Sequence, residues 1–193
     1  MRGERYLMHI TPLKLDGALL VEGARFSDAR GWFEETWSQP RLAALGFSAR
    51  FVQDNLSWSA EAGTLRGLHC QIAPSAQGKL VGVLTGAVRD VIVDARQGSA
   101  SYGRHVSVEL TAEEPVRLWA PAGFLHGFVT LRPDTRVAYK VTAAYDGAAD
   151  RSVAWNDPDL AIDWGVESPI LSDKDRTAPR LKDAGVLFPT RSV

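Results

Sequence analysis

The sequence predicts a mainly β fold, either a sandwich or a barrel, with few helices. Residues 105–110 and 136–141 alternate between apolar and polar side chains with a period of two, which is typical of half-buried strands. Residues 116–119 follow the same pattern, and turn signals separate these short runs. Short strands at this spacing favour two packed sheets or a closed barrel.

Residues 80–84 and 87–94 are two apolar, β-branched runs separated by a Thr-Gly turn signal, so we expect them to form a hairpin. Arg89 and Asp90 interrupt the second run. A charged side chain within an apolar strand is costly to bury without a partner. We therefore expect at least one of these two residues to face a polar cavity.

Two short helices are expected. Ser38 is a candidate N-cap for a helix that runs through Leu45 and is ended by Gly46. A second short helix is expected near Asp173.

The length of 193 residues suits one domain with a full core, and no linker-like or repeated stretch divides the chain. We expect one domain over residues 1–193, with a β core at about 20–145 and a loop-rich tail at 146–193. The tail carries large apolar side chains that are unfavourable in water, namely Trp155, Ile162, Trp164 and Ile170. We therefore expect the tail to pack across the β core.

The composition limits the possible partners. The net charge is −1, so nothing global favours a nucleic acid or a membrane, and an anion would need a local cluster of basic residues. No apolar run approaches the ~20 residues that span a bilayer. Cys70 is the only cysteine, which excludes an intramolecular disulfide. Residues 1–5 are charged and lack the apolar region of a signal peptide, so a cytoplasmic location is expected.

Polar side chains are concentrated in residues 51–59 and 65–71, between apolar strand positions. Arg66 and His69 are costly to bury without partners, and a histidine exchanges protons near neutral pH. One interpretation is a lined pocket for an anionic ligand. The other is a strand edge with solvated polar residues, and this segment alone does not decide between them.

Residues 121–126 have the form P-x-G-x-x-H of the second cupin motif, in which a turn presents a histidine into a small jelly-roll barrel. The companion motif would supply two further histidines and a carboxylate for a metal, but residues 67–71 offer only His69. Beside His126, the amide of Gln71 would be a weak third ligand. The motif therefore favours the barrel and not a metal centre.

A barrel that holds His69, Lys79 and Tyr139 without a metal is suited to proton transfer. Removal of a proton next to a ketone needs a base of near-neutral pKa and positive charge near the developing enolate. His69 suits the first role, Lys79 suits the second, and the phenol of Tyr139 suits a proton donor on the opposite face. Residues 172–175 offer a carboxylate. Each residue also has a plain interpretation, as a core aromatic or a solvated side chain.

The order of these segments along the chain resembles the dTDP-4-dehydrorhamnose 3,5-epimerase family, from about residue 26 to about residue 181. The matching segments are residues 26–33, 51–59, 65–71, 76–81, 86–96, 101–103, 121–128, 139–140, 145, 155–158 and 172–175.

The resemblance implies a cupin-type jelly roll (a double-stranded β-helix) that forms a homodimer and needs no cofactor. It implies epimerisation of dTDP-4-keto-6-deoxyglucose at C3 and C5, next to the C4 ketone, to give dTDP-4-keto-L-rhamnose. His69 would be the base, and the carboxylate of Asp175 would orient it. Tyr139 would be the acid, and Lys79 would stabilise the enolate.

The resemblance also implies a set of substrate-binding residues, which are Arg30, Glu35, Gln53, Asn55, Arg66, His126, Tyr145, Asp150 and Lys174. Tyr145 stands where the family stacks an aromatic ring on thymine. Arg66 stands where the family binds the sugar or the diphosphate, and a guanidinium suits phosphate oxygens.

Three positions depart from the family pattern. Cys70 stands where an aromatic residue is common, which would alter the pocket wall beside His69. Asp150 replaces a glutamate, and Leu125 replaces a smaller residue. These departures leave room for a relative that inverts only C3 of an antibiotic sugar. A metal-dependent cupin enzyme, such as a dioxygenase, and a non-catalytic sugar-nucleotide binder are the more distant alternatives.

Overall fold

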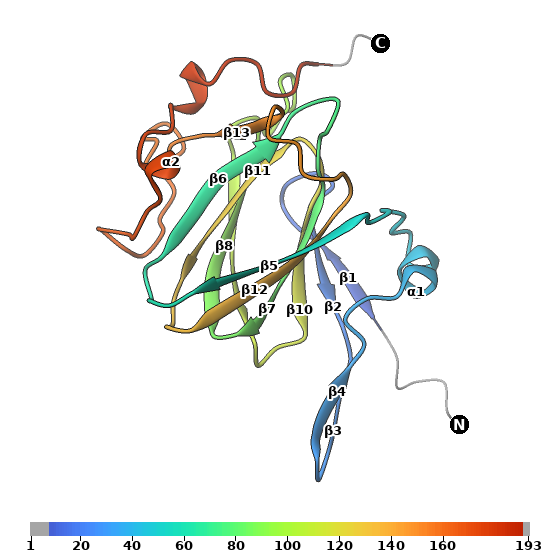
Figure 1. Cartoon of the computed structure of the whole chain (residues 1–193). Coiled ribbons are helices and arrows are strands. Elements are labelled where there is room, and N and C mark those ends of the chain that lie inside the picture. Colours follow the sequence, from blue (N-terminus) through green and yellow to red (C-terminus); the bar gives the residue numbers. More distant parts are fainter. Residues whose placement is uncertain (1–7, 191–193) are drawn as a thin grey trace.

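The computed structural model describes residues 8–190 as two antiparallel sheets that face each other (Figure 1). The six-stranded sheet has the order β1 (His9–Pro12), β2 (Leu19–Glu22), β10 (Val116–Ala120), β7 (Lys79–Thr85), β12 (Thr135–Val141) and β5 (Gln53–Ser59). The five-stranded sheet has the order β13 (Asp150–Ser152), β6 (Leu65–Gln71), β11 (Phe124–Thr130), β8 (Ala87–Asp94) and β9 (His105–Thr111). This is a cupin-type jelly roll, and the predicted mainly β fold is confirmed.

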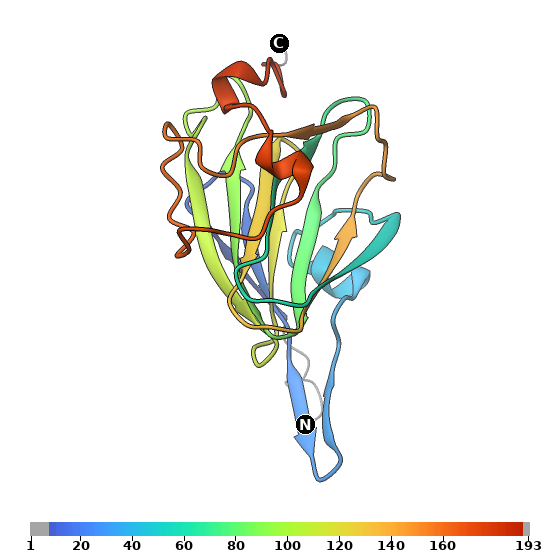
Figure 2. The same cartoon turned by 60° about the vertical axis from the view of Figure 1, so that its left-hand side comes forward.

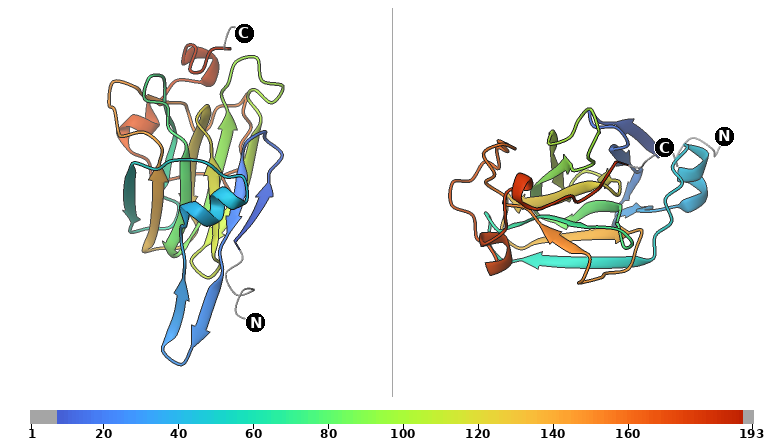
Figure 3. Two further views of the ribbon diagram at one scale, coloured as in Figure 1. Left: turned by 90° about the vertical axis from the view of Figure 1, so that its right-hand side faces the viewer. Right: turned by 90° about the horizontal axis from the view of Figure 1, so that it is seen from above.

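The three strands predicted from alternating side chains are present. They are β9, β10 and β12, and each is one residue longer than the predicted range. Two further strands, β3 (Arg25–Asp28) and β4 (Gly31–Glu34), pair only with each other. Their hairpin projects away from the body of the molecule (Figures 1 and 3).

An apolar core lies between the two sheets. It contains inward-facing residues of both sheets, including Val81, Leu118 and Val137 from the six-stranded sheet and Val88 and Ile92 from the five-stranded sheet. Each of these side chains is nearly inaccessible to solvent, and burial of an aliphatic side chain stabilises the fold by roughly 2 kcal/mol.

The tail packs on the outer face of the five-stranded sheet (Figure 2). Leu160, Trp164 and Leu181 from the tail join Val91 and Leu125 of the sheet in one buried cluster. The tail is therefore part of the hydrophobic core of the protein, and it brings residues far along the chain close to β6 and β11.

The expected hairpin between residues 80–84 and 87–94 is wrong. These runs are β7 and β8, which lie in different sheets. The turn at Gly86 (φ +78°) carries the chain from one sheet to the other, and an added Cβ there would lie 2.2 Å from Thr135 Oγ1. A Thr-Gly turn signal predicts a reversal of the chain, but it does not specify whether the next strand pairs with the previous one.

Both predicted short helices are present. Ser38 is the N-cap of α1 (Gln39–Ala44), although its side chain makes no capping hydrogen bond, and Gly46 follows with φ +86°. Ser172 is the N-cap of α2 (Asp173–Arg176), and its hydroxyl oxygen accepts a hydrogen bond from the backbone N–H of Asp175. A short 3₁₀ helix covers Leu181–Asp183. Within residues 8–190, no helix is long and apolar enough to cross a membrane.

An irregularity in the pairing of β6 with β11 determines which side chains face inward. His126 lies opposite His69, but Phe128 lies opposite Arg66, so β6 contains one extra residue in this interval. In a regular strand, residues 66 and 69 would point to opposite faces of the sheet. Because of the extra residue, Arg66 and His69 both face the space between the sheets.

Gly67 makes this β-bulge possible. It has φ +130°, a backbone conformation that residues other than glycine rarely adopt. The two backbones also approach so closely that a Cβ on Gly67 would lie 2.5 Å from Gly127 Cα and 2.9 Å from the carbonyl oxygen of His126.

Replacement of Gly67 by alanine should therefore destabilise the protein strongly. Gly63 is a matched control, since it also has a positive φ (+78°) but nothing lies within 4 Å of an added Cβ. We expect Gly63→Ala to lower the free energy of unfolding by about 1 kcal/mol, and Gly67→Ala to lower it by about 2 kcal/mol more. Urea unfolding measures both values, and equal losses would contradict the importance of the close approach.

Candidate active site

A cavity of about 420 Å³ lies between the inner faces of the two sheets. Six residues singled out in the sequence line it, namely Arg66, His69, Lys79, His126, Tyr139 and Asp175. For residues 65–71, the lined pocket is therefore the correct interpretation, and the solvated strand edge is not.

His69 and Asp175 form the shortest polar contact in the cavity. His69 lies on β6, Asp175 lies on α2, and Nε2 is 2.5 Å from Oδ1. Burial raises the pKa of the Asp175 carboxyl, but the hydrogen bonds from His69 and Ser172 outweigh burial and the net pKa is lowered. The carboxylate therefore accepts the Nε2 proton, which leaves His69 Nδ1 as the nitrogen that can act as a base.

Lys79 provides a positive charge at the cavity. Its side chain faces inward from β7, and burial lowers the pKa of its ammonium group. Among residues 8–190, no side chain or backbone oxygen accepts a hydrogen bond from its Nζ. A cation in this setting is suited to stabilise negative charge on a bound ligand.

Tyr139 faces the cavity from β12, next to β7 in the six-stranded sheet. Burial raises the pKa of its phenol, so the hydroxyl keeps its proton at neutral pH. His69 belongs to the opposite sheet. A ligand between the sheets would therefore have a base on one side and a proton donor on the other.

Arg66 and His126 complete the polar lining. Arg66 donates hydrogen bonds to Ser59 Oγ (3.3 Å) and to the carbonyl oxygen of Trp58 (3.0 Å), which hold its guanidinium beside β5. His126 is buried, and its Nε2 lies 2.7 Å from Asp90 Oδ1. Neither Arg89 nor Asp90 lines this cavity, contrary to the expectation that one of them faces a polar cavity; Asp90 instead contacts His126, which does line it.

Five of the predicted substrate-binding residues lie outside the cavity lining and contact one another: Gln53, Asn55, Tyr145, Asp150 and Lys174. The backbone N–H of Tyr145 donates to Gln53 Oε1 (3.0 Å), and its phenol lies 3.5 Å from Asp150 Oδ2. Lys174 forms an ion pair with Asp150. The Tyr145 ring is 66% exposed and is therefore accessible for stacking.

Arg30 and Glu35 form no hydrogen bond or ion pair with this cluster in the described part of the chain. Arg30 is at the tip of the β3–β4 hairpin, its side chain is 89% exposed, and it pairs with Asp28 at 2.6 Å. Glu35 follows β4 and forms an ion pair with Arg41. One chain by itself does not bring these two side chains to the cavity.

Two departures from the family pattern do not affect the cavity. Cys70 was expected to alter the pocket wall, but its side chain packs in the core beneath the tail, where burial raises the pKa of the thiol to about 12. Leu125 is fully buried in the same cluster. Both residues neighbour an inward-facing histidine along their strand, so the alternation of side chains directs them to the other face.

Gln71 has a structural role. Its Nε2 donates to the carbonyl oxygens of Ser75 (2.8 Å) and Ala144 (3.1 Å), and its Oε1 accepts from the backbone N–H of Asp146 (2.9 Å). The amide thus holds the loop that carries Tyr145. Within residues 8–190, no group of three His, Cys, Asp or Glu side chains is placed to hold a metal ion.

Several cavity residues were not predicted. Ser57 lies two positions after Asn55 and Phe128 lies two positions after His126 on the same strands. The alternation of side-chain direction along a strand could therefore have predicted both. Ile170 and Leu171 reach the cavity from the tail. No local pattern predicts these two contacts, because they depend on how the tail folds back.

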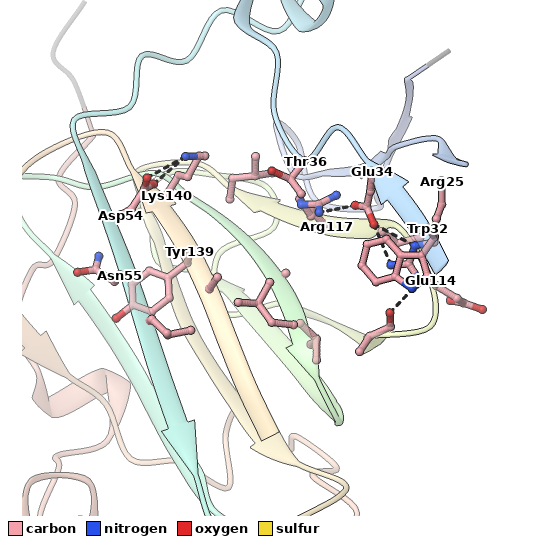
Figure 4. Close-up of a pocket in the computed structure, with 18 residues that line it drawn as sticks. Arg25, Trp32, Glu34, Thr36, Asp54, Asn55, Glu114, Arg117, Tyr139 and Lys140 are labelled. Atoms are coloured by element: carbon pink, nitrogen blue, oxygen red, sulfur yellow. Dashed lines mark hydrogen bonds and ion pairs between the residues drawn. The ribbon is translucent and has the colours of Figure 1, made fainter. Parts of the chain in front are cut away.

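A second pocket of about 370 Å³ lies on the outer face of the six-stranded sheet, beside the base of the β3–β4 hairpin (Figure 4). In it, Glu34 is held between Arg25 (2.8 Å) and Arg117 (2.5 Å). The guanidinium of Arg25 also lies over the Trp32 ring, 3.9 Å from its centroid. These contacts fix the hairpin to the sheet.

Comparison with known proteins agrees with the fold and the site. A family model for dTDP-4-dehydrorhamnose 3,5-epimerase matches residues 12–183. The dTDP-4-dehydrorhamnose 3,5-epimerase of Sinorhizobium fredii is 45% identical over 186 residues, which cover 94% of this chain and 93% of the relative.

Solved structures agree with this match. The dTDP-4-dehydrorhamnose 3,5-epimerase of Bacillus anthracis, with TDP and PPi bound, has a TM-score of 0.88 at 48% identity and covers 90% of this chain and 99% of its own. The Legionella pneumophila 3,5-epimerase in complex with dTDP-4-keto-L-rhamnose has a TM-score of 0.90 at 41% identity. The match covers 96% of this chain and 100% of the Legionella chain. A less similar structure is the 3′-monoepimerase ChmJ of Streptomyces bikiniensis with dTDP-quinovose, which has a TM-score of 0.86 at 35% identity. The match covers 93% of this chain and 92% of the ChmJ chain.

The fold and the cavity define a cupin-type protein with a histidine–carboxylate pair facing a tyrosine and a lysine. The chain belongs to the dTDP-4-dehydrorhamnose 3,5-epimerase family.

Proposed function

We propose that this protein is an isomerase that epimerises dTDP-4-keto-6-deoxyglucose at C3 and C5 to give dTDP-4-keto-L-rhamnose. The observation that carries the proposal is the arrangement of one cavity, with the His69–Asp175 pair on one side and Tyr139 on the other. Inversion of a carbon next to a ketone needs a base and an acid on opposite faces of that carbon.

In the proposed mechanism, His69 Nδ1 removes the C3 proton, and the electron pair of the C3–H bond forms an enolate whose negative charge lies on O4. The ammonium of Lys79 stabilises this charge. The phenol of Tyr139 then donates its proton to C3 from the opposite face. Exchange with water returns a proton to Tyr139 and removes one from His69, and the same steps invert C5.

Inversion of both carbons is favoured over inversion of C3 alone. Relatives at 41–48% identity carry the 3,5-epimerase name, and one of them holds dTDP-4-keto-L-rhamnose. The 3′-monoepimerase is 35% identical. A non-catalytic binder has no need for a base, an acid and a cation in one cavity. Family membership disfavours a dioxygenase.

We expect the nucleotide to lie beside the cluster formed by Gln53, Asn55, Tyr145, Asp150 and Lys174. We propose that Tyr145 stacks on thymine, because its ring is accessible and its backbone is held by Gln53. Arg66 and Lys174 are the cations that would contact the diphosphate. Arg66 lines the cavity, and Lys174 pairs with Asp150 in the cluster beside it. We expect this reaction to take place in the cytoplasm.

We also propose that the protein is a homodimer. Large apolar side chains are exposed on the β3–β4 hairpin and on the outer face of the six-stranded sheet, namely Trp32, Phe33, Leu56, Trp58 and Leu84. Such a patch favours association. A second copy would also explain why Arg30, which belongs to the predicted substrate-binding set, lies on a projecting hairpin away from its own cavity.

The activity is tested by proton NMR of dTDP-4-keto-6-deoxyglucose incubated with the wild-type protein in D2O. We expect deuterium to enter at both C3 and C5, and a 4-keto reductase to trap a product of L-lyxo configuration. Deuterium at C3 alone would identify a mono-epimerase. No exchange at either carbon would contradict the proposed activity.

Two substitutions separate the roles of base and acid. His69→Ala should reduce exchange at both carbons by about 10²–10⁴-fold. Tyr139→Phe should suppress inversion more than exchange, because His69 would still remove and return a proton on its own face. His105→Ala and Tyr102→Phe are the controls, since both residues lie outside the cavity lining. Equal loss of exchange and inversion in Tyr139→Phe would refute its role as the acid.

The homodimer is tested by light scattering after size-exclusion chromatography. Wild-type protein should have twice the mass of one chain, and Phe33→Glu combined with Leu56→Glu should shift it to the mass of a monomer, because two charges would be placed in the apolar patch. Val186→Glu is the control, since Val186 is 56% exposed on the tail, and Phe33 and Leu56 are 62% and 64% exposed. A wild-type monomer, or a dimer unaffected by the double substitution, would contradict this interface.

A further inference from the structure

Asp90 is a buried carboxylate that the proposed mechanism does not use. It lies on β8 between Val88 and Ile92, and its side chain has no exposed surface. Oδ1 contacts His126 Nε2 at 2.7 Å, while Oδ2 has no hydrogen-bond partner among residues 8–190. A carboxylate buried with one unpartnered oxygen is unfavourable unless nearby charges compensate it.

The nearby charge is that of Lys79. Burial lowers the pKa of this ammonium group, and four ionisable groups on surrounding elements also act on it: Cys70 of β6, Asp150 of β13, Asp90 of β8 and Lys174 of α2. The remaining titratable or charged side chains of the same cavity are Arg66, His69, His126, Tyr139 and Asp175.

Among the acidic groups that act on Lys79, Asp90 is the one without a cation of its own. The Cys70 thiol is neutral near pH 7, since burial raises its pKa to about 12. Asp150 is paired with Lys174. Among the described residues, His126 is the only hydrogen-bond partner of the Asp90 side chain, and the charge of Asp90 also acts on Lys79.

We propose that Asp90 is a positioning residue that orients His126 through Nε2 and places a buried negative charge on the sheet that faces Lys79. This inference rests on the proposed function. Because the Nε2 proton of His126 is held by the carboxylate, Nδ1 is the nitrogen left for a bound ligand. Two histidine–aspartate pairs thus meet the cavity, of which one orients the base and the other presents His126 to a bound ligand.

Loss of the Asp90 charge should change how the rate depends on pH, through the pKa of Lys79. The rate requires the ammonium form of Lys79, so the rate falls as the pH rises through the Lys79 pKa. Asp90 raises that pKa against the effect of burial. Removal of the carboxylate charge therefore lowers the Lys79 pKa further, and the alkaline decline in rate should begin at a lower pH.

The test compares Asp90→Asn with Asp94→Asn. Asp94 is a matched control because it is equally buried on the same strand, but its carboxylate binds Arg96, Ser99 and Ser101 outside the cavity. For Asp90→Asn, we expect kcat near neutral pH to fall roughly 100-fold, KM to change little, and the alkaline limb of the kcat profile to move to lower pH. Asp94→Asn should lose stability without a shift of that limb.

A second measurement on the wild-type protein needs no variant and is independent of whether Asp90→Asn folds. The ¹⁵N shifts of the His126 imidazole should show a proton on Nε2, and an unprotonated Nε2 would overturn the inference. A pH profile of Asp90→Asn that matches that of Asp94→Asn would also overturn it. If wild-type protein exchanges neither C3 nor C5 in D2O, the proposed function itself fails, which is a separate outcome.

Discussion

The close approach of β6 and β11 at Gly67 is the constraint on which the active site depends. Without the extra residue in β6, Arg66 and His69 would face opposite sides of the sheet. With it, the guanidinium of Arg66 and the imidazole of His69 share one cavity. The strand order then places His126 and Asp90 directly beside them, and the tail adds Asp175.

The division of the ionisable groups between the two sheets explains how a small barrel can hold so much charge. His69 and His126, the two histidines of the five-stranded sheet that line the cavity, are each paired with an aspartate. Lys79 and Tyr139 face them from the other sheet, where burial lowers the pKa of the lysine and raises that of the tyrosine. Burial thus keeps the phenol protonated, while the carboxylates of Asp90 and Asp150 oppose the effect of burial on the Lys79 pKa.

The sequence predicted the β class, three alternating strands, both short helices and six residues of the cavity lining. Its errors came from information that local patterns do not contain. The Thr-Gly turn signal predicts a hairpin, yet β7 pairs with β10 and β12, and β8 pairs with β9 and β11 in the other sheet. The bulge at Gly67 depends on Gly127 of another strand, and Ile170 reaches the cavity through the fold of the tail. The direction of the Cys70 side chain, away from the cavity, could have been predicted, because Cys70 is adjacent to the inward-facing His69 on a strand.

The central claim is that a substrate lies between His69 and Tyr139, and a crystal structure of the protein with a bound dTDP-hexose tests it most directly. The account predicts that the sugar ring lies between the two sheets, with His69 Nδ1 on one face of the ring and the Tyr139 hydroxyl on the other. A sugar ring bound outside this cavity, or with both side chains on the same face, would contradict the account.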